Sequence, residues 1–307
     1  MKCIFGPVAS RRLGRSLGVD LIPYKTCSFD CLYCELGVTT NRTLERKDYV
    51  SPQKILAELK NFLKDLSPAP DFITLGGSGE PTLHSHIGAI IEEIKKITPT
   101  PIAVLTNSSL LCRDDVREAL AKADVILPSL DAATPVVFEY LNRPHPSLNL
   151  KKIIQGLIDF RKKFKGEIWL EILFCLRVND APEELIRLKH AVEEINPDKI
   201  QLNTLDRPPA ENTVFPLNRE QLERIKNFFG PRAEIITNVL PENARSVIAD
   251  VKKRVYDLLK RRPCPFDEIS LTLGISKIEL MDLIEMLKKE GKVSQRFHNN
   301  QVYYQGR

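Results

Sequence analysis

Three cysteines stand close together near the start of the chain. Cys27, Cys31 and Cys34 form a Cys-x3-Cys-x2-Cys run. A cubane [4Fe-4S] cluster normally takes four Cys thiolates, so three closely spaced thiolates leave one iron without a protein ligand. That iron is free to bind a substrate or a cofactor, and reductive chemistry needs such an open position. The spacing therefore predicts an open iron-sulfur site.

Two other interpretations of these cysteines are a zinc site and a set of inert buried thiols. Structural zinc takes four ligands in paired Cys or His groups, and the sequence contains no second such pair. The chain has seven cysteines, an odd number, and four of them stand singly, which is not a disulfide framework. Metal binding in a reducing compartment explains this distribution better.

Composition and hydropathy indicate in which cellular compartment the protein is expected. With 307 residues and 43% apolar composition, the chain can bury a substantial core. There is no run of about 18 apolar residues and no signal-peptide pattern over residues 1–10. We therefore expect a soluble, cytoplasmic protein that does not enter a membrane.

A glycine-rich run, GGSGEPTLH, covers residues 76–84. Its glycines let a ligand approach the backbone, and Glu80 places a carboxylate beside it. Three later predicted strands also end in polar residues, namely Asn107 and Ser108, then Ser129 and Asp131, then Asn203. These side chains would share one rim if the strands are parallel. Capping of the following helices is the alternative role.

Charged residues occur at two further places where a ligand might be recognised. Arg11, Arg12 and Arg15 precede the cysteines, and guanidinium groups near an active-site mouth suit phosphate or carboxylate recognition. Glu171 interrupts an apolar run, EIWLEILFCL. Its side chain would point either into the barrel or toward the surface, and a buried carboxylate needs a partner.

Short β-rich runs alternate with amphipathic helical stretches, which is typical of βα units around a parallel sheet. The predicted strands cover residues 17–23, 71–75, 102–106, 125–129, 168–174 and 199–203. The predicted helices cover residues 52–66, 87–97, 114–122, 150–163 and 182–195, the first with Ser51 as N-cap and Pro52 at its first position. Six βα units favour an α/β fold with a partial (β/α)6 TIM-like barrel over residues 1–240. A doubly wound open sheet is the alternative.

The last part of the chain, residues 241–307, reads as a separate module. Helices are predicted over residues 251–261, 266–273 and 277–290, and strands over 292–297 and 301–304 form a hairpin. Three helices followed by a hairpin resemble a winged helix-turn-helix domain. Its predicted core is Ile269, Leu273, Ile275, Leu280, Ile284 and Leu287.

The basic charge of the chain is concentrated in this module. Residues 251–307 hold 12 Lys or Arg against seven Asp or Glu, whereas residues 1–250 are neutral overall. Such an excess favours nucleic acid as a partner. The residues that would carry it are Lys277, Lys288, Lys289, Lys292 and Arg296. A protein-contact or dimerisation role is the alternative for the module.

The cysteine run carries a resemblance to a known family. With the aromatic residue Tyr33 before Cys34, it resembles the signature of the radical S-adenosylmethionine superfamily. The resemblance implies one [4Fe-4S] cluster on the three cysteines and S-adenosyl-L-methionine chelating the fourth iron. One electron then cleaves the cofactor to methionine and a 5′-deoxyadenosyl radical, which abstracts hydrogen from a substrate. The cofactor-binding residues so implied are Tyr33, Gly77, Ser78, Gly79, Glu80, Asn107, Ser129, Asp131 and Asn203.

Further motifs are similar to the iron-sulfur oxidoreductase branch that includes the tRNA wybutosine-synthesis enzymes. They are GPVASRRLGRSLGVDLIP at residues 6–23, NRPH at 142–145 and NTLDRPPAE at 203–211. Wybutosine enzymes that rebuild a tRNA guanine use a second cluster bound by additional N-terminal cysteines, but here only Cys3 precedes Cys27. The specific tRNA reaction is therefore not carried over.

The leading hypothesis is a radical enzyme that abstracts hydrogen from an unidentified substrate, RNA among the candidates. Its electron donor is expected to be a ferredoxin or flavodoxin. The alternative is an iron-sulfur-dependent regulator that binds nucleic acid through the C-terminal module. A regulator has no need of Glu80 and the polar strand ends around the cluster.

Overall fold

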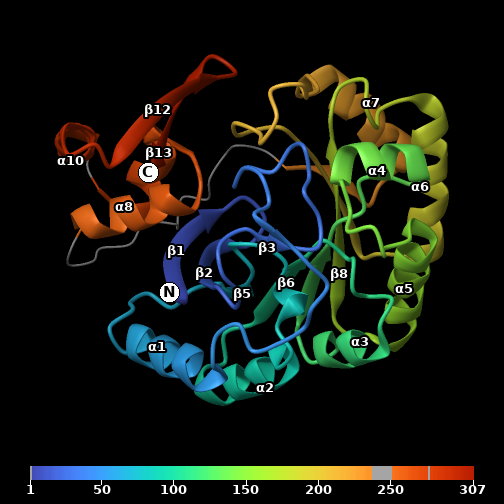
Figure 1. The fold of residues 1–307 in the computed structure, drawn as a ribbon, viewed down its shortest axis with the longest axis horizontal. Coiled ribbons are helices and arrows are strands. Elements are labelled where there is room, and N and C mark those ends of the chain that lie inside the picture. The colour runs from blue at the N-terminus through green and yellow to red at the C-terminus, as the bar shows by residue number, and fades with distance from the viewer. Residues whose placement is uncertain (1, 237–250, 276) are drawn as a thin grey trace.

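The computed structural model describes residues 2–236, 251–275 and 277–307. The predicted boundary between residues 240 and 241 lies outside these residues. Most of the described chain forms one sheet covered by helices, and a smaller C-terminal unit (residues 251–307) lies beside the N-terminal strand (Figure 1).

The large sheet has eight strands in the order β1-β2-β5-β6-β7-β8-β9-β10. Its strands are β1 Ile4–Ser10, β2 Gly14–Val19, β5 Phe72–Leu75, β6 Ile102–Thr106, β7 Val125–Pro128, β8 Glu167–Phe174, β9 Lys199–Thr204 and β10 Ala233–Ile235. From β2 to β10 every neighbouring pair is parallel, and only β1 is antiparallel to β2. The strands follow one another in chain order, whereas a doubly wound sheet reverses its order. The open, sequential sheet is that of a partial barrel.

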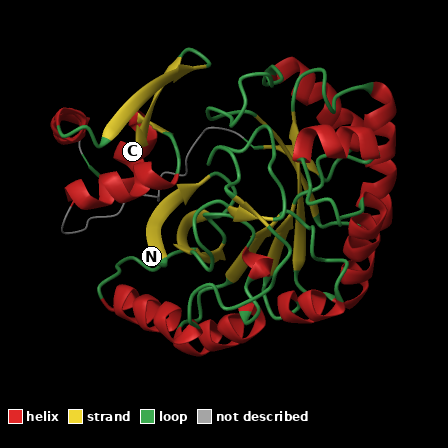
Figure 2. Ribbon diagram, viewed as in Figure 1, coloured by secondary structure: helices red, strands yellow, loops and turns green. Residues whose placement is uncertain are grey.

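Helices cover the outer face of this sheet (Figure 2). They are α1 Pro52–Lys64, α2 Ile87–Ile97, α3 Asp114–Leu120, α4 Pro135–Asn142, α5 Leu150–Lys163, α6 Pro182–Ile195 and α7 Arg219–Phe229. The first helix begins as predicted, because the Ser51 side chain accepts from the Lys54 N–H and Pro52 needs no partner for a missing N–H. Strands pack their apolar side chains against these helices, with Ile73, Ile126 and Ile168 fully buried.

Sequence patterns predicted six of the parallel strands and missed four elements among the large sheet and the α-helices that cover it. The missed elements are β1, β10, α4 and α7. Strand β1 contains Gly6 and Pro7, which weaken a strand signal, and its register shifts between Phe5 and Val8. Predicted strand 17–23 ends earlier, at Val19, because the residues after it leave the sheet toward the cysteines.

The C-terminal unit contains three helices and a three-stranded antiparallel sheet of order β11-β13-β12. Its elements are α8 Val251–Arg261, β11 Cys264–Pro265, α9 Phe266–Leu273, α10 Lys277–Lys289, β12 Val293–His298 and β13 Gln301–Gly306. The predicted helices and hairpin are confirmed, and all six predicted core residues are buried. Helices α8 and α9 contact β1, and Val8 of β1 packs on the unit's apolar core.

Candidate functional site

The three cysteines lie in the cysteine loop, residues 25–37, which follows strand β2. Cys27 belongs to the short strand β3 (Thr26–Cys27), which pairs with β4 (Asn41–Arg42). Thr26 bridges to Gly79, and the Glu80 N–H donates to the Thr26 carbonyl at 3.2 Å. The loop is therefore fixed at the carboxyl edge of the sheet, where barrel enzymes build their sites.

Each cysteine sulfur lies beside a nitrogen that donates toward it. Asn107 Nδ2 lies 3.4 Å from Cys27 Sγ, and Asn142 Nδ2 lies 3.6 Å from Cys31 Sγ. Lys25 Nζ lies 3.2 Å from Cys34 Sγ. Hydrogen bonds of this kind stabilise thiolates and tune the potential of an iron-sulfur cluster.

The thiols of Cys27 and Cys31 lie in an environment that favours neutral sulfur until a metal binds. Burial, followed by the nearby Glu80 carboxylate, raises the pKa of Cys27 to about 12. Burial and the neighbouring cysteines raise the pKa of Cys31 well above its ordinary value. Binding iron would replace these protons, so cluster loading and proton release are linked at this site.

The donor set fits a cluster better than a single ion. Within the described residues, no three His, Cys, Asp or Glu side chains are grouped so as to hold one metal ion. A cubane spreads its ligands over separate irons and so makes a different demand on spacing. Three cysteines, none of them in a disulfide, with a nitrogen donor at each sulfur match that demand.

The glycine turn, residues 76–80, packs directly on the cysteine loop. A Cβ at Gly79 would lie 1.9 Å from the Thr26 carbonyl oxygen, so only glycine fits there. Ser78 is engaged by the protein, since its N–H and Oγ donate to the two Asp20 oxygens at 2.9 and 2.5 Å. Gly77, with φ of +149°, contributes its backbone to a pocket described below. The turn therefore couples the cysteine loop to Asp20.

Glu80 is 2% exposed and caps the short helix η1 (Pro81–Leu83). Its Oε1 accepts from the Thr82 N–H at 3.0 Å and from Thr106 Oγ1 at 2.8 Å, and its Oε2 accepts from the Asn107 N–H at 2.7 Å. Burial raises the pKa of this carboxyl despite these donors. Glu80 thus ties the glycine turn to the end of β6, next to the asparagine that contacts Cys27.

Four of the predicted cofactor-binding residues meet in one cavity of about 260 Å³, which we call the rim cavity. They are Tyr33, Ser129, Asp131 and Asn203, and Cys34 lines the same cavity. They come from the cysteine loop and from the carboxyl ends of β7 and β9, as the shared rim predicts. The other predicted residues, including Glu80 and Asn107, lie around the glycine turn and Cys27.

Asp131 is the central hydrogen-bond acceptor of the rim cavity. Its carboxylate accepts from the Tyr33 hydroxyl, from Asn142 Nδ2 at 3.0 Å and from the Leu173 N–H at 2.9 Å. Burial raises the pKa of Asp131 to about 6 even so. Asn142 contacts both this carboxylate and Cys31, so the rim and the cysteine loop share one network.

Glu171 points into the rim cavity rather than to the outer surface. It pairs with Arg12 and accepts from Asn203 Nδ2 at 3.1 Å. Arg11 lies in the same cavity and pairs with Asp206 at 2.9 Å. Arg15 does not join them: it is buried and donates to the Pro68 carbonyl, so the prediction that it lies at the mouth is wrong.

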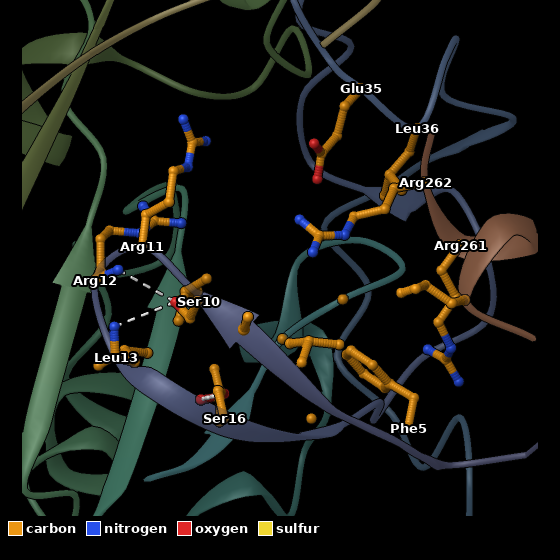
Figure 3. A pocket seen from close by; sticks show the side chains of 18 of the residues that line it. Phe5, Ser10, Arg11, Arg12, Leu13, Ser16, Glu35, Leu36, Arg261 and Arg262 are labelled. Carbon is orange, nitrogen blue, oxygen red and sulfur yellow. Dashed lines mark hydrogen bonds between the residues drawn. The ribbon is translucent and has the colours of Figure 1, made fainter. Parts of the chain in front are cut away.

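A second pocket, of about 190 Å³, adjoins the rim cavity and shares Arg11, Arg12 and Glu35 with it. We call it the arginine pocket. Figure 3 shows Arg262 and Glu35 entering this pocket on the side opposite Arg11 and Arg12. Arg262 directly follows α8, and Leu258 and Arg261 of α8 also line the pocket, so the C-terminal unit forms part of the pocket wall.

The basic residues predicted to bind nucleic acid are partly engaged within the C-terminal unit. Lys277 pairs with Asp267 at 2.7 Å, and Lys292 pairs with Glu290 at 2.8 Å. Lys288 donates to Gln295 at 2.8 Å. The predicted nucleic-acid partner of this unit stays a prediction.

The sequence analysis did not identify the residues that contact the cysteine sulfurs or that support the glycine turn. Lys25 stands two residues before Cys27 and Asn142 stands in the motif NRPH, but neither was assigned a contact with a cysteine. Asp20 and Arg261 are separated by 241 positions, and only the fold brings them together. Asp20 lay inside the predicted strand 17–23, which the structure ends at Val19, so no local signal marked it.

Comparison with known proteins agrees with the site. A family model described as the radical SAM superfamily matches residues 21–188. A UPF0026 protein of Methanocaldococcus jannaschii is 33% identical over 309 residues, covering 99% of this chain and 96% of the relative. A Brachyspira hyodysenteriae protein named GTPase Obg is 37% identical, but the chain spans 45% of its length. A radical SAM methyltransferase from Sphaerobacter thermophilus shares the fold with a TM-score of 0.53 at 15% identity, over 72% of this chain and 65% of that one.

The chain therefore belongs to the radical SAM superfamily, among the UPF0026 proteins. It is a radical SAM enzyme, and the cofactors of that family are a [4Fe-4S] cluster and S-adenosylmethionine. Within the described residues, none of the helices is both long and apolar enough to span a bilayer.

Proposed function

We propose that this enzyme holds one [4Fe-4S] cluster on Cys27, Cys31 and Cys34, cleaves S-adenosylmethionine reductively and removes a hydrogen atom from a substrate. One observation carries the proposal. The three cysteines of an open-cluster motif each have a nitrogen donor at the sulfur, and Cys34 faces the polar rim cavity. When bound, the reduced cluster and S-adenosylmethionine supply the one-electron chemistry.

The protein's own residues would hold and orient the cofactor. Tyr33, Ser129, Asp131 and Asn203 line the cavity next to Cys34 and offer hydroxyl, carboxylate and amide groups. Gly77, Ser78, Gly79 and Glu80 belong to the glycine turn that packs on the cysteine loop, and the Glu80 carboxylate would favour an ammonium group. Lys25, beside Cys34, would offset part of the negative charge of a thiolate-bound cluster.

Three finer assignments belong to this proposal. The order of α8, β11, α9, α10, β12 and β13 supports a winged-helix identity for the C-terminal unit. The motifs at residues 6–23 and 203–211 support a branch similar to the wybutosine-synthesis enzymes. A ferredoxin or flavodoxin in the cytoplasm would supply the electron. Membership of an enzyme superfamily makes the regulator hypothesis the less favoured one.

The test is cofactor cleavage by the reconstituted enzyme. Protein loaded anaerobically with iron and sulfide, then given dithionite and S-adenosylmethionine, should produce 5′-deoxyadenosine. The Cys34→Ala variant should produce none, whereas Cys112→Ala, which removes an exposed thiol outside the site, should match wild type. A fully loaded wild-type enzyme that yields no 5′-deoxyadenosine would overturn the proposal.

A further inference from the structure

Cations predominate among the charged residues that line the arginine pocket. Within the described part of the chain, five of its lining residues are arginines and one, Glu35, is an acid. The arginines are Arg11, Arg12, Arg207, Arg261 and Arg262. Figure 3 shows Arg11 and Arg12 on one side of the pocket and Arg262 on the other. Guanidinium groups therefore line the same space from two directions.

The carboxylates that pair with these arginines belong to neighbouring walls. Glu171, which pairs with Arg12, lines the rim cavity. Glu268 of α9, which pairs with Arg262 at 2.8 Å, lines another, separate cavity. These acids hold the guanidinium groups in place, and their own side chains do not fill the arginine pocket.

Three of the arginines keep N–H groups that have no acceptor among the described residues. A guanidinium group has five N–H donors. That of Arg12 donates through Nη1 alone, to Glu171, and that of Arg262 donates through Nη2 alone. Arg207 is 9% exposed, and its Nε is buried without a hydrogen-bond partner. An oxyanion in the pocket would offer acceptors to donors that now lack them.

The cations of the pocket also lie close enough to repel one another. Burial lowers the pKa of Arg11, and the nearby Arg207 and Arg12 lower it further, while Asp206 acts in the opposite direction. A bound anion would offset this repulsion, because it adds negative charge on the side of the guanidinium groups that faces the pocket.

Apolar side chains form the rest of the wall. Phe5, Val8, Leu105 and Leu258 line the pocket. Its volume of about 190 Å³ is smaller than the roughly 300–1,000 Å³ of cavities that take a whole drug-sized ligand. The pocket therefore suits a compact ligand with one charged group and a small apolar body.

The two-sided arrangement of arginines favours a phosphate over a carboxylate. A carboxylate has two oxygens in one plane, which a single guanidinium fork matches. A phosphate monoester has three acceptor oxygens that point in different directions, and it carries a charge of about −1.5 to −2 at neutral pH. It can therefore accept from Arg12 and from Arg262 at the same time.

We propose that the arginine pocket is a subsite for a phosphate monoester, with Arg12, between β1 and β2, and Arg262, after α8, as its principal ligands. Glu35 lines the pocket and directly follows Cys34, so a molecule bound here lies beside the loop that carries the cysteines. That this molecule is the substrate rests on the proposed function, whereas its binding does not. The C-terminal unit then takes part in substrate recognition.

The test is binding to the full chain in the absence of S-adenosylmethionine, measured by isothermal titration calorimetry. The probes are phenyl phosphate and benzoate, which share a ring and differ in the anionic group. Phenyl phosphate should bind about ten-fold more tightly, because a further charge-assisted hydrogen bond contributes that much or more. The affinity should be the same before and after anaerobic cluster loading, since the ligands are arginines rather than iron.

Variants locate the bound probe. Arg262→Gln should weaken phenyl phosphate binding about ten-fold. In the described part of the chain Arg262 lines the arginine pocket but not the rim cavity, so this loss distinguishes the two. R12Q/E171Q removes a guanidinium together with its carboxylate, leaves no unpaired charge and should weaken binding similarly. The control Arg224→Gln changes an arginine that is 66% exposed and pairs with Glu220 on α7, and it should bind as wild type does.

A second measurement separates misfolding from loss of binding. Phenyl phosphate should raise the unfolding temperature of wild type and of Arg224→Gln, and should raise that of Arg262→Gln less. If Arg262→Gln does not fold, R12Q/E171Q and the two probes on wild type still decide the matter.

Four results would contradict the subsite. They are no binding of phenyl phosphate by wild type, equal or tighter binding of benzoate, binding that requires the cluster, and equal binding by Arg262→Gln and Arg224→Gln. Because S-adenosylmethionine is absent, each of these leaves cofactor cleavage untouched. Conversely, an enzyme that binds phenyl phosphate but cleaves no cofactor would keep the subsite and lose the proposed function.

Discussion

The guanidinium of Arg261 donates to the carboxylate of Asp20 at 2.6 Å and so joins helix α8 to the barrel. Asp20 also accepts from the N–H and the hydroxyl of Ser78. The Asp20 side chain is 3% exposed, so its charge depends on these donors. An arginine of the C-terminal unit therefore helps to hold the glycine turn against the cysteine loop.

Replacing Arg261 by glutamine should destabilise the protein and weaken cofactor binding. The variant leaves a buried carboxylate without its cation, which costs about 3 kcal/mol or more of unfolding free energy. Urea denaturation measures that loss, and the KM for S-adenosylmethionine should rise because the turn loosens. In the D20N background the same change should cost much less. Additive losses in the two backgrounds would show that the residues are not coupled.

Arg207 joins the cysteine loop to the other side of the C-terminal unit. It pairs with Glu35 at 2.7 Å, one residue after Cys34, and with Glu268 of α9 at 2.8 Å. Arg207→Met leaves both carboxylates without this cation, so we expect a loss of about 3 to 5 kcal/mol of unfolding free energy. The triple variant R207M/E35Q/E268Q should recover a large part of it, since the charges are then gone.

The same pair makes stability sensitive to acid. Burial alone would raise the pKa of Glu35, but Arg207 and Arg262 outweigh it and lower the pKa to about 2, from an ordinary 4.5. A carboxyl whose pKa falls on folding adds stability above its ordinary pKa, and that stability is lost as pH falls from 4.5 toward 2. Unfolding followed over this range should show a smaller loss in E35Q than in wild type. Solvent screening limits the size of the difference, because Glu35 is 36% exposed.

Asp131 should have the opposite effect on pH dependence. Burial raises the pKa of this carboxyl to about 6, from an ordinary 3.8. A carboxyl whose pKa rises on folding stabilises the protein below its ordinary pKa, and that advantage is lost as pH rises through the folded value. Between pH 4 and 7 the unfolding free energy of wild type should therefore fall relative to that of D131N, by about 3 kcal/mol at about 1.4 kcal/mol per pKa unit. Parallel pH profiles for the two proteins would contradict this assignment.

Gly79→Ala should reduce cluster loading. A methyl group at this position would lie 1.9 Å from the Thr26 carbonyl oxygen, so the cysteine loop must move away from the glycine turn. We expect several-fold less iron bound after anaerobic reconstitution, measured against protein concentration. Gly230→Ala is the control, because that glycine, at the C-cap of α7, has a positive φ but nothing within 4 Å of its Cβ, so alanine there strains the backbone without such a clash. Equal iron content in the two variants would show that the contact does not position the cysteines.

The parts of the fold and site that could be predicted from the sequence depend on residues that are close together in the chain. The spacing of Cys27, Cys31 and Cys34 and the strand-end positions of Asn107 and Asp131 could be read directly, because a motif or a βα unit lies within a few tens of residues. Six strands and most helices followed from periodicity and from caps such as Ser51.

What the sequence leaves out depends on distant partners. Asn142 lies 111 positions from Cys31, and Arg261 lies 241 positions from Asp20, so neither contact has a local signal. The prediction that Arg15 lies at the mouth of the site was wrong for the same reason, since its partner Pro68 lies in another segment. Strand β1 was not predicted because it pairs antiparallel to β2 at the edge of the sheet and so is not part of a βα unit.

The C-terminal unit is tied to two residues that support the cysteine loop: Arg261 pairs with Asp20, and Glu268 pairs with Arg207. Separating it from the barrel would expose four charged groups that now compensate one another. Heat should therefore melt the two parts in a single calorimetric transition rather than one after the other. Through these ion pairs the unit supports the residues that hold the cysteine loop and the glycine turn in place.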